Sequence, residues 1–241
     1  MRYGIFSDIH SNLEALDAVI EAYRREDIDE YLCIGDLVGY AANPNECIQK
    51  VLALAAVTIA GNHDWASVGL LSTGHFNPFA REAALWTRSN LNEQGRRFLE
   101  GLPLVYKNEH LTLAHGTLDQ PGDFNYMTDA YIASKTLELL ETEICFVGHT
   151  HVPGAFVESE EGMCYHEDGN IDIKKGSRYI INAGSIGQPR DGDPRAAYCI
   201  YDTDKNNIRI KRISYDIQGA RNKIISEGLP GVLGERLLAG R

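Results

Sequence analysis

Short apolar runs alternate with amphipathic segments through the first 150 residues, and this alternation constrains the fold more than any other feature. It is typical of βαβ units, in which helices join parallel strands. Asn12 and Asp129 have side chains suited to capping a helix N-terminus. We expect strands at residues 3–7, 31–34, 57–60, 111–114 and 144–147, and helices from Asn12 to Arg24, after Pro44, and from Asp129 to Leu140.

The pattern changes after Pro153. Runs at residues 155–158, 178–182, 196–202 and 207–214 are short and separated by turn sequences, which is typical of antiparallel strands. No linker rich in Pro, Gly or Ser divides the chain, so we expect a single domain over residues 1–241, with a second sheet packed on the first. Residues 67–101 fit neither pattern, and a helix is expected from Phe79 to Asn90. This segment is either a cap or lid over a site or a surface excursion.

The charge of the chain limits its partners. It has 23 basic and 34 acidic residues, a formal net charge of −11. Because nucleic-acid polymers and anionic membranes are bound through basic surfaces, neither is expected as a partner. No apolar run approaches the roughly 20 residues that span a bilayer, and no signal peptide is evident. The five cysteines form no Cys-x-x-Cys pair, so we interpret them as buried thiols in a reducing cytoplasm.

Each expected strand of the first half is followed by residues of types that bind metals. A single Asp after a strand is more often a helix cap or a turn residue. Because the carboxyl ends of parallel strands meet at one edge of a sheet, however, five such ends predict one shared site. The five stretches are Asp8-Ile9-His10, Gly35-Asp36, Gly61-Asn62-His63-Asp64, His115-Gly116 and Gly148-His149-Thr150-His151.

The spacing of these residues predicts paired ligands. In an extended segment, residues two apart project to the same side, so Asp8 and His10 are expected to act together. Carboxylate, imidazole and amide groups suit borderline divalent ions, with Mn²⁺ expected first and Fe, Zn, Ni or Co as alternatives, rather than a Cys-rich zinc site or a Ca²⁺ cage. Seven candidates are too many for one open site, so we expect two ions sharing a carboxylate. The candidates are Asp8, His10, Asp36, Asn62, His115, His149 and His151.

These stretches resemble the motifs of calcineurin-like metallophosphoesterases, namely Asp-x-His, Gly-Asp, Gly-Asn-His-Asp/Glu, a lone His and Gly-His-x-His, in that order. The stretch from Asn182 to Arg190 is similar to small bacterial members related to diadenosine tetraphosphatases and compact phosphodiesterases. The resemblance implies an α/β/β/α sandwich of two packed mixed sheets with a two-metal site at one edge. It also implies a ligand assignment: Asp8, His10 and His151 for one ion, Asn62, His115 and His149 for the other, and Asp36 bridging.

The resemblance further implies that His63 contacts the substrate phosphate and assists the leaving group, oriented by Asp64. For a phosphate ester, two ions about 3.5–4 Å apart would supply a bridging hydroxide as the nucleophile. A protonated His63 would then act as general acid. Weaker candidates for substrate contacts, each with a solvated surface role as the alternative, are Arg190, Arg195, His75, Asn125 and Tyr126.

The motifs favour hydrolysis of a small phosphorylated substrate over two alternatives. The first is a non-catalytic metal-binding scaffold of the same fold, which the complete Asn62-His63-Asp64 stretch opposes. The second is a dimetal amidohydrolase or metallo-β-lactamase-like hydrolase, in which His-x-His comes early, whereas here Asp8-Ile9-His10 comes first. The sequence leaves open the oligomeric state and the choice between a monoester, a phosphodiester, a dinucleoside polyphosphate and a phosphoprotein.

Overall fold

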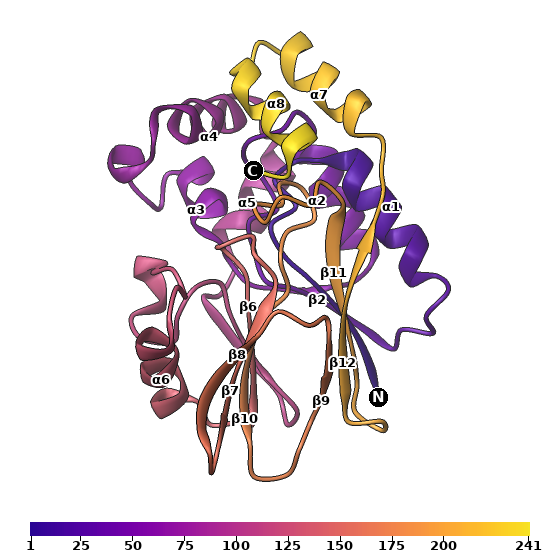
Figure 1. Cartoon of the computed structure of the whole chain (residues 1–241). Coiled ribbons are helices and arrows are strands. Elements are labelled where there is room, and N and C mark those ends of the chain that lie inside the picture. Colours follow the sequence, from indigo (N-terminus) through magenta and orange to yellow (C-terminus); the bar gives the residue numbers. More distant parts are fainter.

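Two six-stranded β-sheets pack face to face and carry helices on their outer sides (Figure 1). The computed structural model describes residues 1–241. The first sheet has the order β3-β2-β1-β11-β12-β9, with β1 (Arg2–Phe6), β2 (Glu30–Cys33), β3 (Val57–Thr58), β9 (Asn170–Asp172), β11 (Ala196–Asp202) and β12 (Asn207–Ile213). The second has the order β4-β5-β6-β10-β7-β8, with β4 (Val105–Lys107), β5 (Thr112–Ala114), β6 (Ile144–Val147), β7 (Gly154–Ser159), β8 (Gly162–His166) and β10 (Arg178–Asn182).

The two halves of the chain share both sheets. Strands β1, β2 and β3 run parallel, and β1 then pairs with β11 in antiparallel register. In the second sheet β5, β6 and β10 are parallel, and β10 pairs with β7 in antiparallel register. The expectation that the second half builds its own sheet is therefore wrong. Strands β10 and β11 are almost wholly buried, and the N–H and C=O groups of a buried strand need hydrogen-bonded neighbours on both edges.

Alternation along the strands divides the core into two layers. Tyr3 and Ile5 of β1 face the second sheet, where they meet Phe146 and Ile181, whereas Phe6 faces the helices outside the first sheet. Successive side chains of a strand point to opposite faces, so a strand buried on both sides is apolar at every position. Each fully buried Ile or Phe side chain contributes about 1.5–3 kcal/mol, so both layers of the core stabilise the fold.

Helices cover both outer faces, which gives the expected α/β/β/α layering. Asn12 caps α1 by accepting the N–H of Ala15 at 3.2 Å, and Asp129 caps α6 by accepting the N–H of Ile132 at 3.0 Å, so both predicted caps are confirmed. The first sheet is covered by α1 (Leu13–Tyr23), α2 (Pro44–Ala53) and α5 (Glu93–Glu100), and the second by α6 (Ala130–Leu139).

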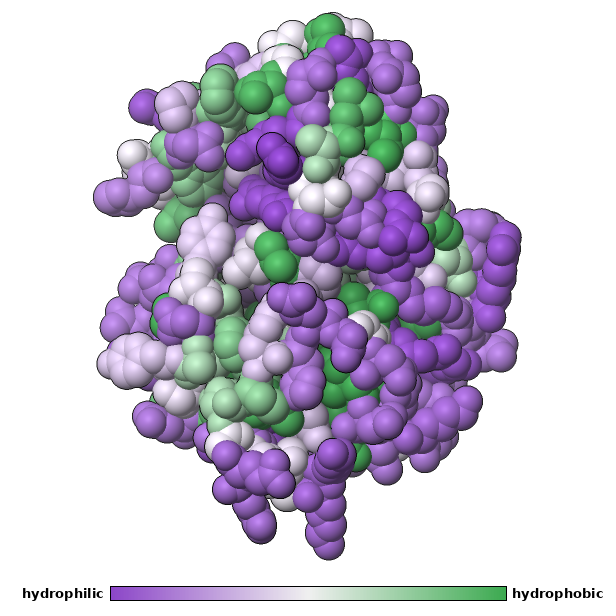
Figure 2. Space-filling view, viewed as in Figure 1, coloured by the Kyte–Doolittle hydropathy of each residue, from purple (hydrophilic) through white to green (hydrophobic).

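A further group of helices lies at one end of the sheets, at the top of Figure 1. The segment at residues 67–101 contains the predicted helix, which begins at Pro78. Two C-terminal helices that the sequence analysis did not anticipate pack on it through Ala83, Ala220 and Leu233, and Figure 2 shows apolar residues exposed among polar ones over this end. The elements are α3 (Asn62–Val68), the 3-10 turn η1 (Thr73–His75), α4 (Pro78–Asn90), α7 (Ile217–Ser226) and α8 (Gly231–Ala239).

The cysteines are all free thiols, and four of them are buried. Cys164 is exposed, which corrects the expectation that all five are buried. It lies on β8, an edge strand whose residues are mostly exposed. None of the helices combines the length and apolar character needed to cross a membrane.

Candidate active site

The metal-binding residue types converge from both sheets, not from a single parallel sheet as expected. Asp8 and Asp36 follow β1 and β2 of the first sheet, and Asn62 opens α3 just after β3. His115 follows β5 and His149 follows β6, both in the second sheet. The parallel strands of the two sheets end at the same edge of the sandwich, so the site lies across the joint between them.

The backbone that presents these residues is left-handed, which corrects the expectation of extended segments. Residues two apart do converge, but tight turns bring them together instead of strand alternation. A non-glycine residue in this region costs on the order of 1 kcal/mol or more and is concentrated at functional sites. The candidates with positive φ are Asp8 (54°), His10 (50°), Asp36 (53°), His149 (67°) and His151 (61°).

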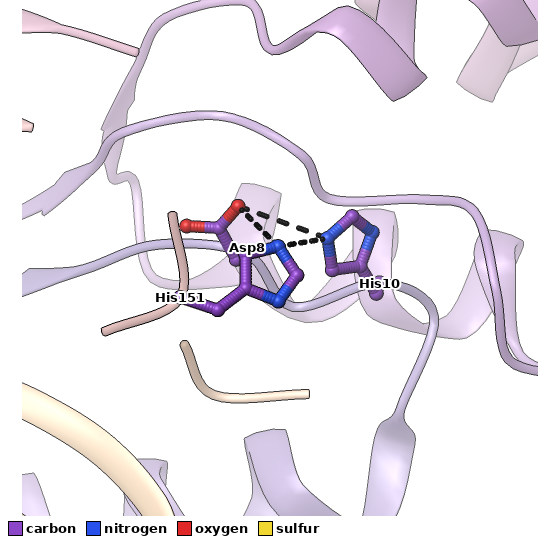
Figure 3. A group of neighbouring side chains, drawn as sticks. All are labelled: Asp8, His10 and His151. Carbon is purple, nitrogen blue, oxygen red and sulfur yellow. Dashed lines mark hydrogen bonds and ion pairs between the residues drawn. The ribbon is translucent and has the colours of Figure 1, made fainter. Parts of the chain in front are cut away.

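Asp8, His10 and His151 form one group of potential ligands (Figure 3). Asp8 Oδ1 lies 3.1 Å from His151 Nε2 and 3.7 Å from His10 Nε2. The two Nε2 atoms are 3.0 Å apart. The other carboxylate oxygen, Oδ2, accepts the backbone N–H of His149 at 3.0 Å, which fixes the carboxylate with Oδ1 toward the imidazoles.

Asp36, His115 and His149 form the second group. Asp36 Oδ2 lies 3.3 Å from His115 Nε2 and 3.6 Å from His10 Nε2, so the carboxylate stands between the two groups. His115 Nε2 is 3.2 Å from His149 Nδ1. Asp36 Oδ1 accepts the backbone N–H of His63 at 2.8 Å. Asp36 Oδ2 therefore faces both groups of potential ligands.

Backbone carbonyls fix the tautomers of three histidines. His10 Nδ1 lies 3.1 Å from the carbonyl oxygen of Val38, and His151 Nδ1 lies 2.5 Å from that of Gln188. His115 Nδ1 is held in the same way by a carbonyl oxygen at 2.7 Å. Because a carbonyl only accepts, each Nδ1 carries the proton, and in a neutral ring Nε2 then offers its lone pair. Such backing of a ligand by a backbone carbonyl is usual in metal sites.

Three buried oxygens at this site have no hydrogen-bond partner: Asp8 Oδ1, Asp36 Oδ2 and Asn62 Oδ1. Leaving a buried polar atom unpaired costs about 1–3 kcal/mol. The Nε2 atoms of His10 and His151 are also without a donor, since two unprotonated nitrogens that face each other cannot form a hydrogen bond. Cations bound between these atoms would give each of them a partner. The residues therefore fit a pair of bound metal ions.

The protonation of the histidines also suits metal binding. Burial lowers the pKa of His149 to about 3 and lowers that of His10 well below its usual range, so both rings are neutral at pH 7. Burial acts in the same direction on His115, but the carboxylates of Asp36 and Asp8 outweigh it and raise its pKa to about 9. In the metal-free protein His115 is therefore protonated at pH 7, and its positive charge offsets the nearby carboxylates as a metal ion would.

His63 lies beside the ligands, in a set with His10 and Asp36. Its Nδ1 is buried without a partner, and burial lowers the pKa of the ring to about 4. Its expected orientation by Asp64 is wrong, because no hydrogen bond joins the two side chains. The Asp64 carboxylate instead accepts backbone N–H groups, including those of Asp36 at 2.8 Å and Gly61 at 3.0 Å. Asp64 is the third residue of α3, so these hydrogen bonds hold the first turn of that helix against the loop that contains Asp36.

Arg190 is the expected phosphate contact that the structure does bring to the site. Its backbone N–H donates to the carbonyl of His151 at 3.3 Å. Its guanidinium donates to Gln188 Oε1 at 2.9 Å and to the Tyr40 hydroxyl at 3.3 Å. The charge of Arg190 contributes to the lowered pKa of His63, after burial. The side chain is thus held near the ligands by neutral partners and keeps its positive charge available.

Two other expected substrate contacts are not brought to the site. Arg195 pairs with Asp193 at 2.6 Å in an exposed turn, because the acid two residues away binds it locally. Asn125 lines a separate cavity with Lys135, and its carbonyl oxygen packs against Gly116. His75 and Tyr126, in contrast, do line the cavity that contains His63.

Several aromatic residues at the site were missed by the sequence analysis. The Tyr40 ring lies 4.4 Å from that of His63, and the Phe124 ring 5.9 Å from that of His115. Phe124 is buried in a left-handed conformation, φ 52°, which is unusual for a bulky residue. Neither residue follows a strand directly or belongs to a repeated spacing, so the sequence contained no signal for them.

Two packed mixed sheets with carboxylates and imidazoles gathered at their joined strand ends are the framework of metal-dependent phosphoesterases. The chain belongs to the calcineurin-like phosphoesterase superfamily, whose domain matches residues 1–206. This confirms the resemblance and the fold class expected from the motifs.

Similar proteins extend the match over the whole chain. An uncharacterized protein from Methanocaldococcus jannaschii is 40% identical over 242 residues, which cover 99% of this chain and 98% of that protein. The crystal structure of a metallophosphoesterase from Sphaerobacter thermophilus is 40% identical, with a TM-score of 0.89 over 100% of this chain and 99% of that one. A hypothetical protein from Pyrococcus horikoshii shares the fold at 19% identity, with a TM-score of 0.81 over 100% of this chain and 98% of that one.

Proposed function

We propose that this protein is an enzyme that hydrolyses phosphate esters at a two-metal centre. The single observation that carries the proposal is the position of Asp36, whose unpaired Oδ2 lies between the ligand group of His10 and that of His115. Membership of the phosphoesterase superfamily supports phosphoester hydrolysis in general.

Two divalent transition-metal ions are the proposed cofactors. Asp8, His10 and His151 would hold one ion, Asn62, His115 and His149 the other, and Asp36 would bind both. The mixed oxygen and nitrogen donors favour Mn²⁺, with Fe, Zn, Ni and Co as alternatives. When bound, such ions supply Lewis-acid charge that activates water and neutralises phosphate oxygens.

The side chains of the protein position the ester and handle its protons. Arg190 would donate to a phosphate oxygen, because its guanidinium is held near His151 only by neutral partners. His63 has a pKa of about 4 in the free protein, so it is neutral at pH 7 before substrate binds. The negative charge of a bound phosphate would raise that pKa, which would allow His63 to carry a proton to the leaving oxygen.

The proposed substrates are small phosphate monoesters or diesters, including nucleotides and dinucleoside polyphosphates. The net charge of −11 disfavours long nucleic acids, since these are bound through basic surfaces. The four buried free thiols agree with a cytoplasmic protein, where thiols stay reduced.

The test is a comparison of three substrates with purified, Mn²⁺-loaded protein: p-nitrophenyl phosphate, bis-p-nitrophenyl phosphate and diadenosine tetraphosphate. We expect hydrolysis of at least one, abolished by EDTA and restored by Mn²⁺. Full activity after demonstrated removal of metal would contradict the metal mechanism. A metal-loaded protein that cleaves none of the three would favour the non-catalytic scaffold.

A further inference from the structure

A cavity of about 420 Å³ opens beside the candidate metal centre. Asn62, His63 and His149 contribute to its lining, so it adjoins His63 and the ligand group that contains His149. Its other walls come from residues 71–80, before and at the start of α4, and residues 123–126, before α6. In the space-filling view, the left-hand outline is indented between the α4 region and the α6 region (Figure 2).

Aromatic rings from separate parts of the chain form the walls of this cavity. The Phe76 ring lies 4.9 Å from that of His63, and the Tyr40 ring lies 4.4 Å from it. Tyr126 stacks on His149 with ring centroids 3.9 Å apart and an interplanar angle of 14°. Although stacked, Tyr126 is 48% exposed, so much of its surface remains free for a ligand.

The cavity lining carries no lysine or arginine. It does contain the acidic Asp123, with Ser72 and Asn77 as neutral hydrogen-bonding groups. Arg190 contacts the Tyr40 hydroxyl but does not line the cavity itself. A phosphate chain that extended away from the metal centre into this space would therefore meet a carboxylate and no lysine or arginine, whereas an uncharged ring would meet aromatic surface and neutral polar groups.

We infer that this cavity binds the flat, uncharged ring of a phosphate ester, such as an aryl group or a nucleoside base, and that Tyr126 and Phe76 determine this specificity. The inference rests on the proposed function, because the ester phosphate occupies the metal centre next to His63. Stacking on aromatic side chains suits any flat ring, since every such ring has a π-face. Esters that place further phosphates in the cavity are disfavoured.

The first test measures ring binding without hydrolysis. Adenosine, which has no phosphate, is titrated into the metal-loaded protein by ligand-observed NMR, with ribose as the ring-free control. We expect adenosine but not ribose to bind. Tyr126→Ala and Phe76→Ala should each weaken adenosine binding about fivefold or more, because stacking on an aromatic side chain is lost. Tyr126→Phe keeps the ring and should bind adenosine as the wild type does.

Matched controls remove aromatic rings outside the cavity. Phe79 of α4 lies three residues after Phe76 and is 44% exposed, and Tyr131 of α6 is 69% exposed. Neither lines the cavity, so Phe79→Ala and Tyr131→Ala should leave adenosine binding unchanged. Equal binding of adenosine and ribose by the wild type, or unchanged adenosine binding in both Tyr126→Ala and Phe76→Ala, would overturn the inference.

The second test uses hydrolysis. Phenyl phosphate is compared with a fluorinated alkyl phosphate whose alcohol has matched acidity, so that only the ring differs. Tyr126→Ala should raise KM for the phenyl ester about fivefold or more and leave KM for the alkyl ester unchanged. An equal rise for both esters would contradict ring recognition. If the wild type hydrolyses neither ester, the three-substrate comparison decides the proposed function, and the adenosine titration separately decides the inference about the cavity.

Discussion

The Asp64 carboxylate holds the backbone of Asp36 in place, with Oδ2 accepting the N–H of Asp36 at 2.8 Å. The same oxygen accepts the N–H of Gly61 at 3.0 Å, and Oδ1 accepts those of Leu37 at 2.8 Å and Val38 at 3.2 Å. Asp64 therefore organises the loop that carries the expected bridging ligand. It is a positioning residue and makes no contact with the cavity.

Asp64→Ala should weaken metal binding about 10–100-fold, the usual effect of losing a group that orients ligands. It leaves buried N–H groups without an acceptor, so the free energy of unfolding should also fall by about 1–3 kcal/mol or more. Asp64→Asn keeps one acceptor oxygen, so its metal affinity and its free energy of unfolding should lie between those of the wild type and Asp64→Ala. Metal titration with a competing chelator and denaturant unfolding measure both effects. Wild-type metal affinity in Asp64→Ala would contradict the positioning role.

Asp36→Asn should lose metal from both positions and reduce hydrolysis by about two orders of magnitude or more, because a single carboxylate faces both ligand groups. Elemental analysis after dialysis and kcat/KM for an aryl phosphate measure the two losses. Asp168→Asn, at an exposed position between β8 and β9, is the control for charge and should behave as the wild type. Two firmly bound ions in Asp36→Asn would show that Asp36 does not bridge.

His63→Ala should keep both metals yet lose roughly 10²-fold or more in kcat, because the ring is proposed to move a proton and not to bind metal. The loss should be greater for an alkyl phosphate than for p-nitrophenyl phosphate, whose leaving group hardly needs a proton. Elemental analysis separates the two roles. A variant that loses an ion would identify His63 as a ligand, and one with wild-type rates on both esters would show that it is structural.

Gly61→Ala should displace the Asp36 carboxylate, because a Cβ at this position would clash with Asp36 Oδ1. We expect metal content to fall and the free energy of unfolding to drop by about 1–3 kcal/mol, as for other insertions into packed regions. Gly231→Ala is the matched control, since a Cβ there meets open space. If Gly61→Ala bound two ions with wild-type affinity, the close approach of Gly61 to Asp36 would not be needed for metal binding.

Glu26→Gln should destabilise the protein at pH 7 but not at low pH. Burial raises the pKa of Glu26, but Lys211, Arg209 and Arg2 outweigh it and lower the pKa overall. A lowered carboxylate pKa contributes stability above the unfolded pKa of about 4.3, and this contribution is lost as the pH falls through the folded pKa.

At pH 7 the difference in unfolding free energy between the wild type and Glu26→Gln should be on the order of 1 kcal/mol. It should be smaller at an acidic pH, where the glutamate of the folded wild type takes up its proton. Denaturant titrations at both pH values measure it, with the exposed Glu161→Gln as the charge control. A difference independent of pH would mean that packing, not charge, accounts for the effect.

Local patterns in the sequence predicted much of the structure. The caps Asn12 and Asp129 were predictable because a capping side chain acts on N–H groups two or three residues away. The convergence of Asp8 and Asp36 was predictable because they follow neighbouring parallel strands, which end at a common edge. These inferences need only neighbours along the chain or a general rule of strand direction.

Pairings between distant segments could not be predicted in the same way. Nothing local indicates that β11 joins β1 or that β10 joins β6. The left-handed backbone at His10 and His151 was also hidden, since non-glycine residues rarely adopt it and the surrounding fold imposes it. Phe124 had no signal, because a single aromatic residue in a loop looks the same whether it packs on His115 or on the surface.

The pairing of His10 with His151 has a consequence for how the protein folds and unfolds. His10 follows β1 of one sheet and His151 follows β6 of the other, and their Nε2 atoms are 3.0 Å apart. An ion held between them would link the two sheets. This binding site could form only after the sheets had packed together. Separation of the sheets should therefore release the metal, and bound metal should in turn stabilise the docked arrangement of the two sheets against unfolding.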